Sequence, residues 1–126
     1  MRNRTKSREY ALQMLYQADI RRAGAQQILE GFWREPEPGE EVKTFANELF
    51  GGTMAHLADI DAVIAGHADN WNVKRMAVID RNILRLGVFE LLHQEGVPPK
   101  VCINEAIELA KRFGDAESSK FINGIL

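Results

Sequence analysis

The chemistry most readily visible in the sequence is cationic and lies at the N-terminus. Residues 1–8 contain no acid and four basic side chains, namely Arg2, Arg4, Lys6 and Arg8. Removing these four from the 16 basic residues of the chain leaves 12 against 18 acids, so residues 9–126 carry a formal charge of about −6. A basic arm on an acidic body indicates a local surface for binding anions. The alternative is a solvated, frayed terminus, which on charge alone is the more common case.

Catalytic chemistry has no comparable signature. The motifs Gly-x-Ser-x-Gly, His-Glu-x-x-His and Cys-x-x-Cys and the glycine-rich phosphate loops are absent. The three histidines do not have metal-ligand spacing. Cys102 lies beside an amphipathic helix, where a packed thiol is more common than a nucleophile. Carboxylates from distant segments could still converge, but the expectation is a binding protein rather than an enzyme.

Length and composition favour one soluble domain. A chain of 126 residues fits one core, or two small helical halves that share one. No apolar run approaches the roughly 18 residues that a membrane span needs, and the polar N-terminus does not resemble a signal peptide. A single cysteine excludes an internal disulfide and suits a reducing compartment. We therefore predict a single cytoplasmic domain over residues 1–126, with a basic arm formed by residues 1–8.

Helical periodicity begins just after the basic arm. From Ser7 the apolar residues recur at spacings of three and four for about four turns, with Thr5 or Ser7 available as the N-cap. In this arrangement Arg8 projects from a fixed helix, while Arg2 and Arg4 stay mobile.

The rest of the chain also reads as helices. Residues 42–68 predict a long or kinked helix in which Gly51-Gly52 marks a kink or a close helix crossing, and breaks are expected at Pro36 and at residues 70–72. No segment alternates between apolar and polar residues at period two, as a half-buried strand would. The predicted fold class is all-α, with about six or seven helices in two bundles that share a central helix.

The most apolar segment, residues 78–92, predicts this central helix. Arg81 and Arg85 stand four residues apart on it, and one of them needs a carboxylate because an unpaired buried charge is costly. Glu105 and Glu90 are the candidate partners. We predict a structural ion pair between Arg85 and Glu105.

A strongly patterned helix and the opening of a second one occupy residues 103–126. The apolar stripe of the first comprises Ile103, Ala106, Ile107, Ala110 and Phe113. Gly114 follows it, where a left-handed C-cap is usual. Glu108 and Arg112 have the spacing and order of a surface ion pair within one helix.

Several stretches of the sequence together resemble a known family. They are Arg8-Glu-Tyr-Ala-Leu-Gln-Met-Leu-Tyr-Gln17, Asp80-Arg-Asn-Ile-Leu-Arg-Leu-Gly-Val-Phe-Glu-Leu-Leu92, Val97-Pro98, Ile103-Asn-Glu-Ala-Ile-Glu-Leu-Ala-Lys111, Phe113-Gly114 and Lys120-Phe-Ile-Asn-Gly-Ile-Leu126. These motifs are similar to those of the NusB family of bacterial transcription antitermination factors. Residues 24–70 add only helical periodicity to the resemblance.

The resemblance implies a fold, partners and a function. The fold would be two three-helix bundles, and no reaction and no cofactor are implied. NusB-like proteins join the ribosomal protein NusE, bind the boxA element of nascent RNA and help RNA polymerase to pass terminators, notably in ribosomal RNA operons. Two alternatives stay open: the RNA-binding module of a ribosomal RNA cytosine methyltransferase, and a helical scaffold that binds no RNA. A homodimer that covers the RNA face is compatible with the first interpretation.

The resemblance also assigns residues to an RNA-binding face. That face would contain Arg2, Arg4, Lys6, Arg8, Tyr16, Lys120 and Phe121, so that the two ends of the chain meet, while Asp80 would face NusE. Cations that hold phosphates and aromatic rings that stack bases are what single-stranded RNA requires. Tyr16 and Phe121 also lie on apolar stripes, so a core position is the alternative for both. The arm is less dense in arginine than in many relatives, and many relatives continue past the position of Leu126, which predicts a short last helix.

Overall fold

The computed structural model describes residues 2–33, 38–67, 73–94 and 96–126. Its elements are α1 (Arg2–Arg21), α2 (Ala25–Phe32), α3 (Glu40–Ala55), α4 (Leu57–His67), the 3₁₀ turn η1 (Val73–Arg75), α5 (Val78–His93), α6 (Pro99–Phe113) and α7 (Ser118–Ile125). These described elements are all helical, which confirms the predicted fold class. The predicted breaks at position 36 and residues 70–72 lie outside the described residues.

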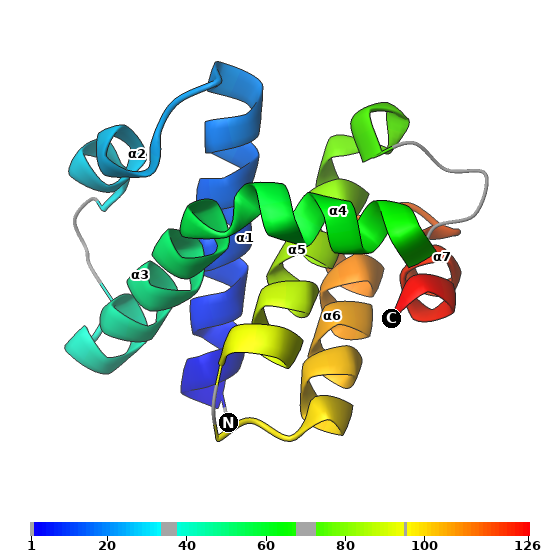
Figure 1. Ribbon diagram of the computed structural model, residues 1–126. Coiled ribbons are helices and arrows are strands. Elements are labelled where there is room, and N and C mark those ends of the chain that lie inside the picture. Colours follow the sequence, from blue (N-terminus) through cyan, green and yellow to red (C-terminus); the bar gives the residue numbers. More distant parts are fainter. Residues whose placement is uncertain (1, 34–37, 68–72, 95) are drawn as a thin grey trace.

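Helix α5 is the centre of the packing, as its apolar sequence predicts. It contacts α1, α3, α4, α6 and α7. Figure 1 shows α1, α5 and α6 side by side, with α3 and α4 crossing them. Its buried apolar side chains are Ile83, Leu84, Leu86, Val88 and Phe89. Burial of this set on several sides of one helix is the main apolar contribution that joins the two halves of the fold.

The first helix begins at Arg2 and not at Ser7, so the prediction of a mobile arm with a cap at Thr5 or Ser7 is wrong. The reason is the role of Ser7, which is buried in the first turns. Its hydroxyl group lies within hydrogen-bond distance of the carbonyl oxygens of Asn3 (2.9 Å) and Val42 (2.8 Å). Ser7 therefore ties α1 to α3 instead of capping a helix, and the basic arm forms the first two turns of α1.

The two consecutive glycines do not break α3, which runs without interruption to Ala55. They mark a close helix crossing instead, which was the other predicted possibility. A Cβ atom added at Gly52 would lie 2.1 Å from Cζ of Phe89 on α5, whereas one added at Gly51 would meet nothing within 4 Å. Only Gly52 is therefore required by packing.

Gly114 is not a left-handed cap, because its φ of −93° and ψ of −171° are extended values that any residue can adopt. The glycine is required by contact: an added Cβ would lie 2.4 Å from the Ser118 hydroxyl oxygen and 2.8 Å from the Ala110 carbonyl oxygen. The chain thus turns tightly from α6 into α7.

The predicted ion pair between Arg85 and Glu105 is wrong, although each residue is paired. Arg85 donates through Nε and Nη2 to Asp61 of α4 (2.8 Å each) and through Nη1 to Asp19 of α1 (3.1 Å). Glu105 instead accepts hydrogen bonds from Thr5 and Arg8 in the first turns of α1. Burial raises the pKa of Asp19, but hydrogen bonds from Arg81 and Asn82 outweigh this effect and hold the pKa below its ordinary value. Spacing along α5 identified the need for a carboxylate but could not identify which helix supplies it.

Cys102 is a packed thiol, as its position suggests. It is buried between the helices. Burial and the nearby Glu90 carboxylate raise its pKa. A thiol that stays protonated is a poor nucleophile.

Candidate nucleic-acid interface

The structure removes Arg8 from the RNA-binding face that the sequence predicts. Its side chain is only 1% exposed, and its Nε and Nη2 atoms donate to the Glu90 carboxylate at 2.8–3.0 Å. Its Nη1 atom donates to Glu105 at 3.3 Å. Burial disfavours the charged guanidinium, but the two carboxylates raise the pKa of Arg8 above its ordinary value. Arg8 is therefore part of a buried ion cluster with Glu90 and Glu105 that joins α1 to α5 and α6.

The two remaining cations of the basic arm whose side chains are described, Arg4 and Lys6, lie on different sides of α1. In a helix, residues two positions apart point about 200° apart around the axis. Arg4 is exposed with its guanidinium 4.4 Å from the centre of the Phe45 ring on α3. Lys6 is exposed on another side, 3.6 Å from Oε1 of Glu9. The side chain of Arg2 lies outside the described residues.

The turn between α6 and α7 is held by hydrogen bonds of its own polar side chains. The Asp115 backbone N–H donates to the Ser118 hydroxyl oxygen at 2.9 Å, and the Glu117 backbone N–H donates to Oδ1 of Asp115 at 2.9 Å. This turn fixes the start of α7, which carries Lys120 and Phe121.

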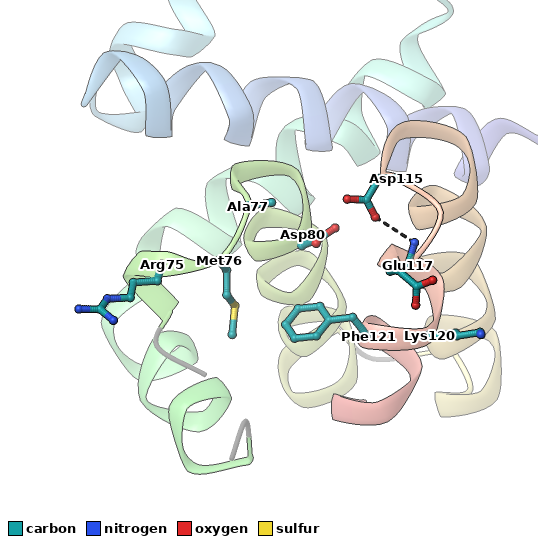
Figure 2. Close-up of a pocket in the computed structure, with 8 residues that line it drawn as sticks. All are labelled: Arg75, Met76, Ala77, Asp80, Asp115, Glu117, Lys120 and Phe121. Carbon is teal, nitrogen blue, oxygen red and sulfur yellow. Dashed lines mark hydrogen bonds between the residues drawn. The ribbon is translucent and has the colours of Figure 1, made fainter. Parts of the chain in front are cut away.

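Two adjoining pockets lie beside this turn. The larger, of about 610 Å³, is lined by Arg75, Met76, Ala77, Asp80, Asp115, Glu117, Lys120 and Phe121. The second, of about 450 Å³, is lined by Tyr16, Ala77, Val78, Ile79, Asp80, Phe113, Gly114, Asp115 and Ser118. The two pockets adjoin, because Ala77, Asp80 and Asp115 line both, and together we call them the α5–α7 groove. Figure 2 shows the Phe121 ring pointing into it while Lys120 extends in the opposite direction.

The structure shows whether Tyr16 and Phe121 are core or surface residues, which the sequence left open. Tyr16 is 38% exposed, so it is a surface residue and not core. Phe121 combines both roles: it is partly buried against the core and also lines the groove. Asp80 lies where the two pockets join, and among the described residues its buried Oδ1 has no hydrogen-bond partner. The groove therefore offers the aromatic surface of Tyr16 and Phe121 together with the Asp80 side chain, which lines both pockets.

The two ends of the chain do not meet, which corrects the last part of the predicted face. Lys6 precedes Tyr16 by ten residues, or about 15 Å along α1. Figure 1 shows the N-terminal end of α1 near the start of α6 and away from α7. The groove meets α1 at Tyr16, so the cationic start of α1 and the aromatic groove are successive parts of a longer surface.

Two residues of this surface were missed at the sequence level, Arg112 and Phe113. The sequence paired Arg112 with Glu108 and placed Phe113 in the apolar stripe of its helix. In the structure Arg112 forms an ion pair with Glu9 of α1. Nζ of Lys111 lies 3.5 Å from Oε2 of Glu108. Phe113 is half-exposed and lines the groove with Tyr16. The only sequence signal for Arg112 and Phe113 was their position in the last turn of a helix. The spacing of residues along one helix does not reveal its contacts with other helices.

Neither a metal-binding cluster nor a membrane-spanning helix is found in the part of the chain that the structure describes. No group of three or more His, Cys, Asp or Glu side chains is arranged to hold a metal ion there. None of the described helices is both long and apolar enough to cross a membrane.

These features define a class of protein: an all-helical binding protein with an elongated surface of cations and aromatic rings. The model of the NusB family matches residues 5–126. The chain therefore belongs to the NusB family.

Similar proteins span nearly the whole chain. The transcription antitermination protein NusB of Anaeromyxobacter sp. (strain Fw109-5) is 49% identical over 124 residues, which cover 98% of this chain and 86% of that protein. The corresponding protein of Myxococcus xanthus (strain DK1622) is 46% identical, over 98% of this chain and 91% of its own length.

Solved structures agree with this assignment. T. maritima NusB superposes with a TM-score of 0.87 at 37% identity and covers 97% of this chain and 86% of its own. A protein from a crystal structure of the antitermination factors NusB and NusE in complex with dsRNA gives a TM-score of 0.85 at 27% identity, over 99% of this chain and 93% of its own.

Proposed function

We propose that this chain is a transcription antitermination factor that binds boxA RNA of nascent transcripts together with NusE and promotes passage of RNA polymerase through terminators. The observation that carries the proposal is the α5–α7 groove, which places Tyr16 and Phe121 on one surface in a chain that belongs to the NusB family. Relatives named for antitermination match 98% of the chain. A binding role without catalysis, in one domain acting in the cytoplasm where transcripts form, follows from the same proposal.

Single-stranded RNA suits this surface better than a duplex does. Unpaired bases can be splayed out and stacked on aromatic side chains, whereas a duplex keeps its bases stacked on one another. Lys120 lines the groove and Lys6 lies ten residues before Tyr16 on α1; both are exposed and available for phosphates. Arg4 would contribute from the α3 side, and Arg2 stays in the proposal as a residue at the start of α1. The methyltransferase module gains no support from the relatives reported above.

Asp80 is proposed as a contact to NusE. Its side chain lines both pockets, and its Oδ1 atom is buried without a hydrogen-bond partner in the described structure. A shift of this side chain on binding would let the carboxylate accept a hydrogen bond from a donor of NusE, which would recover the free energy that an unpaired buried acceptor costs. RNA and NusE would then meet on neighbouring parts of the groove.

The test is a binding titration of the protein with NusE against three RNAs: a boxA single strand, a scrambled single strand of the same composition, and the boxA duplex. We expect the boxA single strand to bind tightest. If about three phosphates are contacted, the logarithm of affinity should fall with the logarithm of salt concentration with a slope near −2. Equal affinity for the boxA and scrambled strands would overturn the proposal. Protein concentrations are kept below any self-association, because a homodimer through this face would compete with RNA.

Phe121 provides a prediction about the groove itself. Phe121→Leu keeps an apolar side chain against the core but removes the ring on which a base stacks. Since one base stacked on an aromatic ring contributes roughly 1–3 kcal/mol, we expect boxA affinity to fall by about tenfold. The measurement is the same titration, with thermal unfolding followed by circular dichroism to show that the fold is retained.

The matched control is Leu92→Ala, which removes an exposed apolar side chain near the other end of α5. Leu92 is twelve residues from Asp80, or about 18 Å along the helix. Its replacement should leave RNA affinity unchanged. A similar loss for both variants would mean that the groove has no special role.

A further inference from the structure

The edge between α1 and α6 carries three charged side chains in contact. Glu9 of α1 is only 5% exposed, and both of its carboxylate oxygens are used. Oε1 lies 3.6 Å from Nζ of Lys6, and Oε2 accepts a hydrogen bond from Nη1 of Arg112 on α6. One buried carboxylate thus holds two cations side by side, and these three side chains together carry a net charge of +1. Glu105 and Glu108 line the same pocket as Glu9 and Arg112, but they are paired with Arg8 and Lys111.

Arg112 remains open to a second partner. Its side chain is 55% exposed. Its guanidinium carries five N–H donors, of which the described contacts use one. The planar group also lies 5.7 Å from the centre of the Phe113 ring. An arginine held in this way can donate to a phosphate through its remaining N–H groups without first being ordered from a loose state.

The position of Arg112 joins the two parts of the surface described above. On one side it shares Glu9 with Lys6, which belongs to the basic arm. On the other side the next residue, Phe113, lines the α5–α7 groove together with Tyr16. Arg112 therefore lies between the cation of the first turns and the aromatic groove, in the interval of about 15 Å that separates Lys6 from Tyr16 along α1.

We propose that Arg112 is a further RNA-binding residue, which holds a backbone phosphate of the single strand between Lys6 and the Tyr16–Phe113 end of the groove. Glu9 is the positioning residue that fixes the guanidinium. This inference rests on the proposed function. The competing explanation is that Arg112 and Glu9 only clamp α6 to α1, and the experiment separates the two.

The experiment compares Arg112→Gln with Lys111→Gln in the titration of a labelled boxA single strand in the presence of NusE. Both variants remove one positive charge, and Lys111, at 59% exposure, is as open to solvent as Arg112. Lys111 points about 100° away around α6. We expect Arg112→Gln to weaken binding about fivefold and to reduce the magnitude of the salt slope by about 0.7, the value of one phosphate on a single strand. Lys111→Gln should change affinity less than twofold.

A second variant covers the case in which Arg112→Gln destabilises the fold by leaving Glu9 short of a partner. The double variant Glu9→Gln/Arg112→Gln also removes the Glu9 carboxylate, which would otherwise lack its arginine partner, and it has the net charge of the parent protein. Its salt slope should still be smaller by about 0.7. A slope equal to that of the parent, or equal effects of Arg112→Gln and Lys111→Gln, would overturn the assignment of Arg112. Failure of the parent protein to prefer boxA RNA would instead overturn the proposed function, so the two failures are distinguishable.

Discussion

Replacing Arg8 with methionine is expected to lower the free energy of unfolding by about 3–5 kcal/mol, because it leaves the buried carboxylate of Glu90 without its partner. Glu90 is as inaccessible to water as Arg8, so solvent cannot replace the lost hydrogen bonds. A loss of this size is a large share of the roughly 5–15 kcal/mol that stabilises an ordinary domain. The measurement is urea unfolding followed by circular dichroism.

The double variant Arg8→Met/Glu90→Leu serves as the control. Replacing both members of a buried ion pair with apolar residues of similar size is often neutral or stabilising, so most of the lost stability should return. The refolded double variant should bind boxA RNA with NusE as tightly as the parent protein, because Arg8 does not reach the surface. A stable Arg8→Met variant with reduced RNA affinity would instead restore Arg8 to the RNA-binding face.

The sequence predicted the helices well and their mutual contacts poorly, and Arg8 illustrates why. Apolar periodicity reports one face of one helix, which is sufficient for an all-α fold with α5 at its centre. It does not report where a charged residue at the margin of that face will point. An arginine in a basic arm resembles a solvated cation until the carboxylates of two other helices are known to surround it.

The candidate site shows the same limit. Tyr16, Lys120 and Phe121 were predicted from their motifs, and Tyr16 and Phe121 line adjoining pockets. Arg112 was assigned to Glu108 because pairing rules read from sequence cover only neighbours within one helix. Its actual partner, Glu9, is 103 positions away in the sequence. Residues that act between helices need the packing angle and register of both helices, which no single-helix pattern contains.

Gly52→Ala is expected to destabilise the protein by about 2–3 kcal/mol, even though alanine is the better helix former. The added Cβ would lie 2.1–2.9 Å from three ring atoms of Phe89. That ring cannot move freely, because it is buried and lies in a stack with His56 and His93, at centroid distances of 6.2 Å and 5.7 Å. Relief of the clash requires α3 and α5 to move apart, which loosens the contact between the two halves of the core.

Gly51→Ala is the matched control, one residue away in the same helix. Nothing lies within 4 Å of its added Cβ, so the ordinary helix preference should apply and the variant should be more stable by about 0.5–1 kcal/mol. Urea unfolding of the two variants should thus give changes of opposite sign. Combining Gly52→Ala with Phe89→Leu should cost less than the sum of the single changes, because the smaller side chain gives the methyl group room. If Gly52→Ala proved as stable as Gly51→Ala, the close crossing at Phe89 would not be what retains glycine at this position.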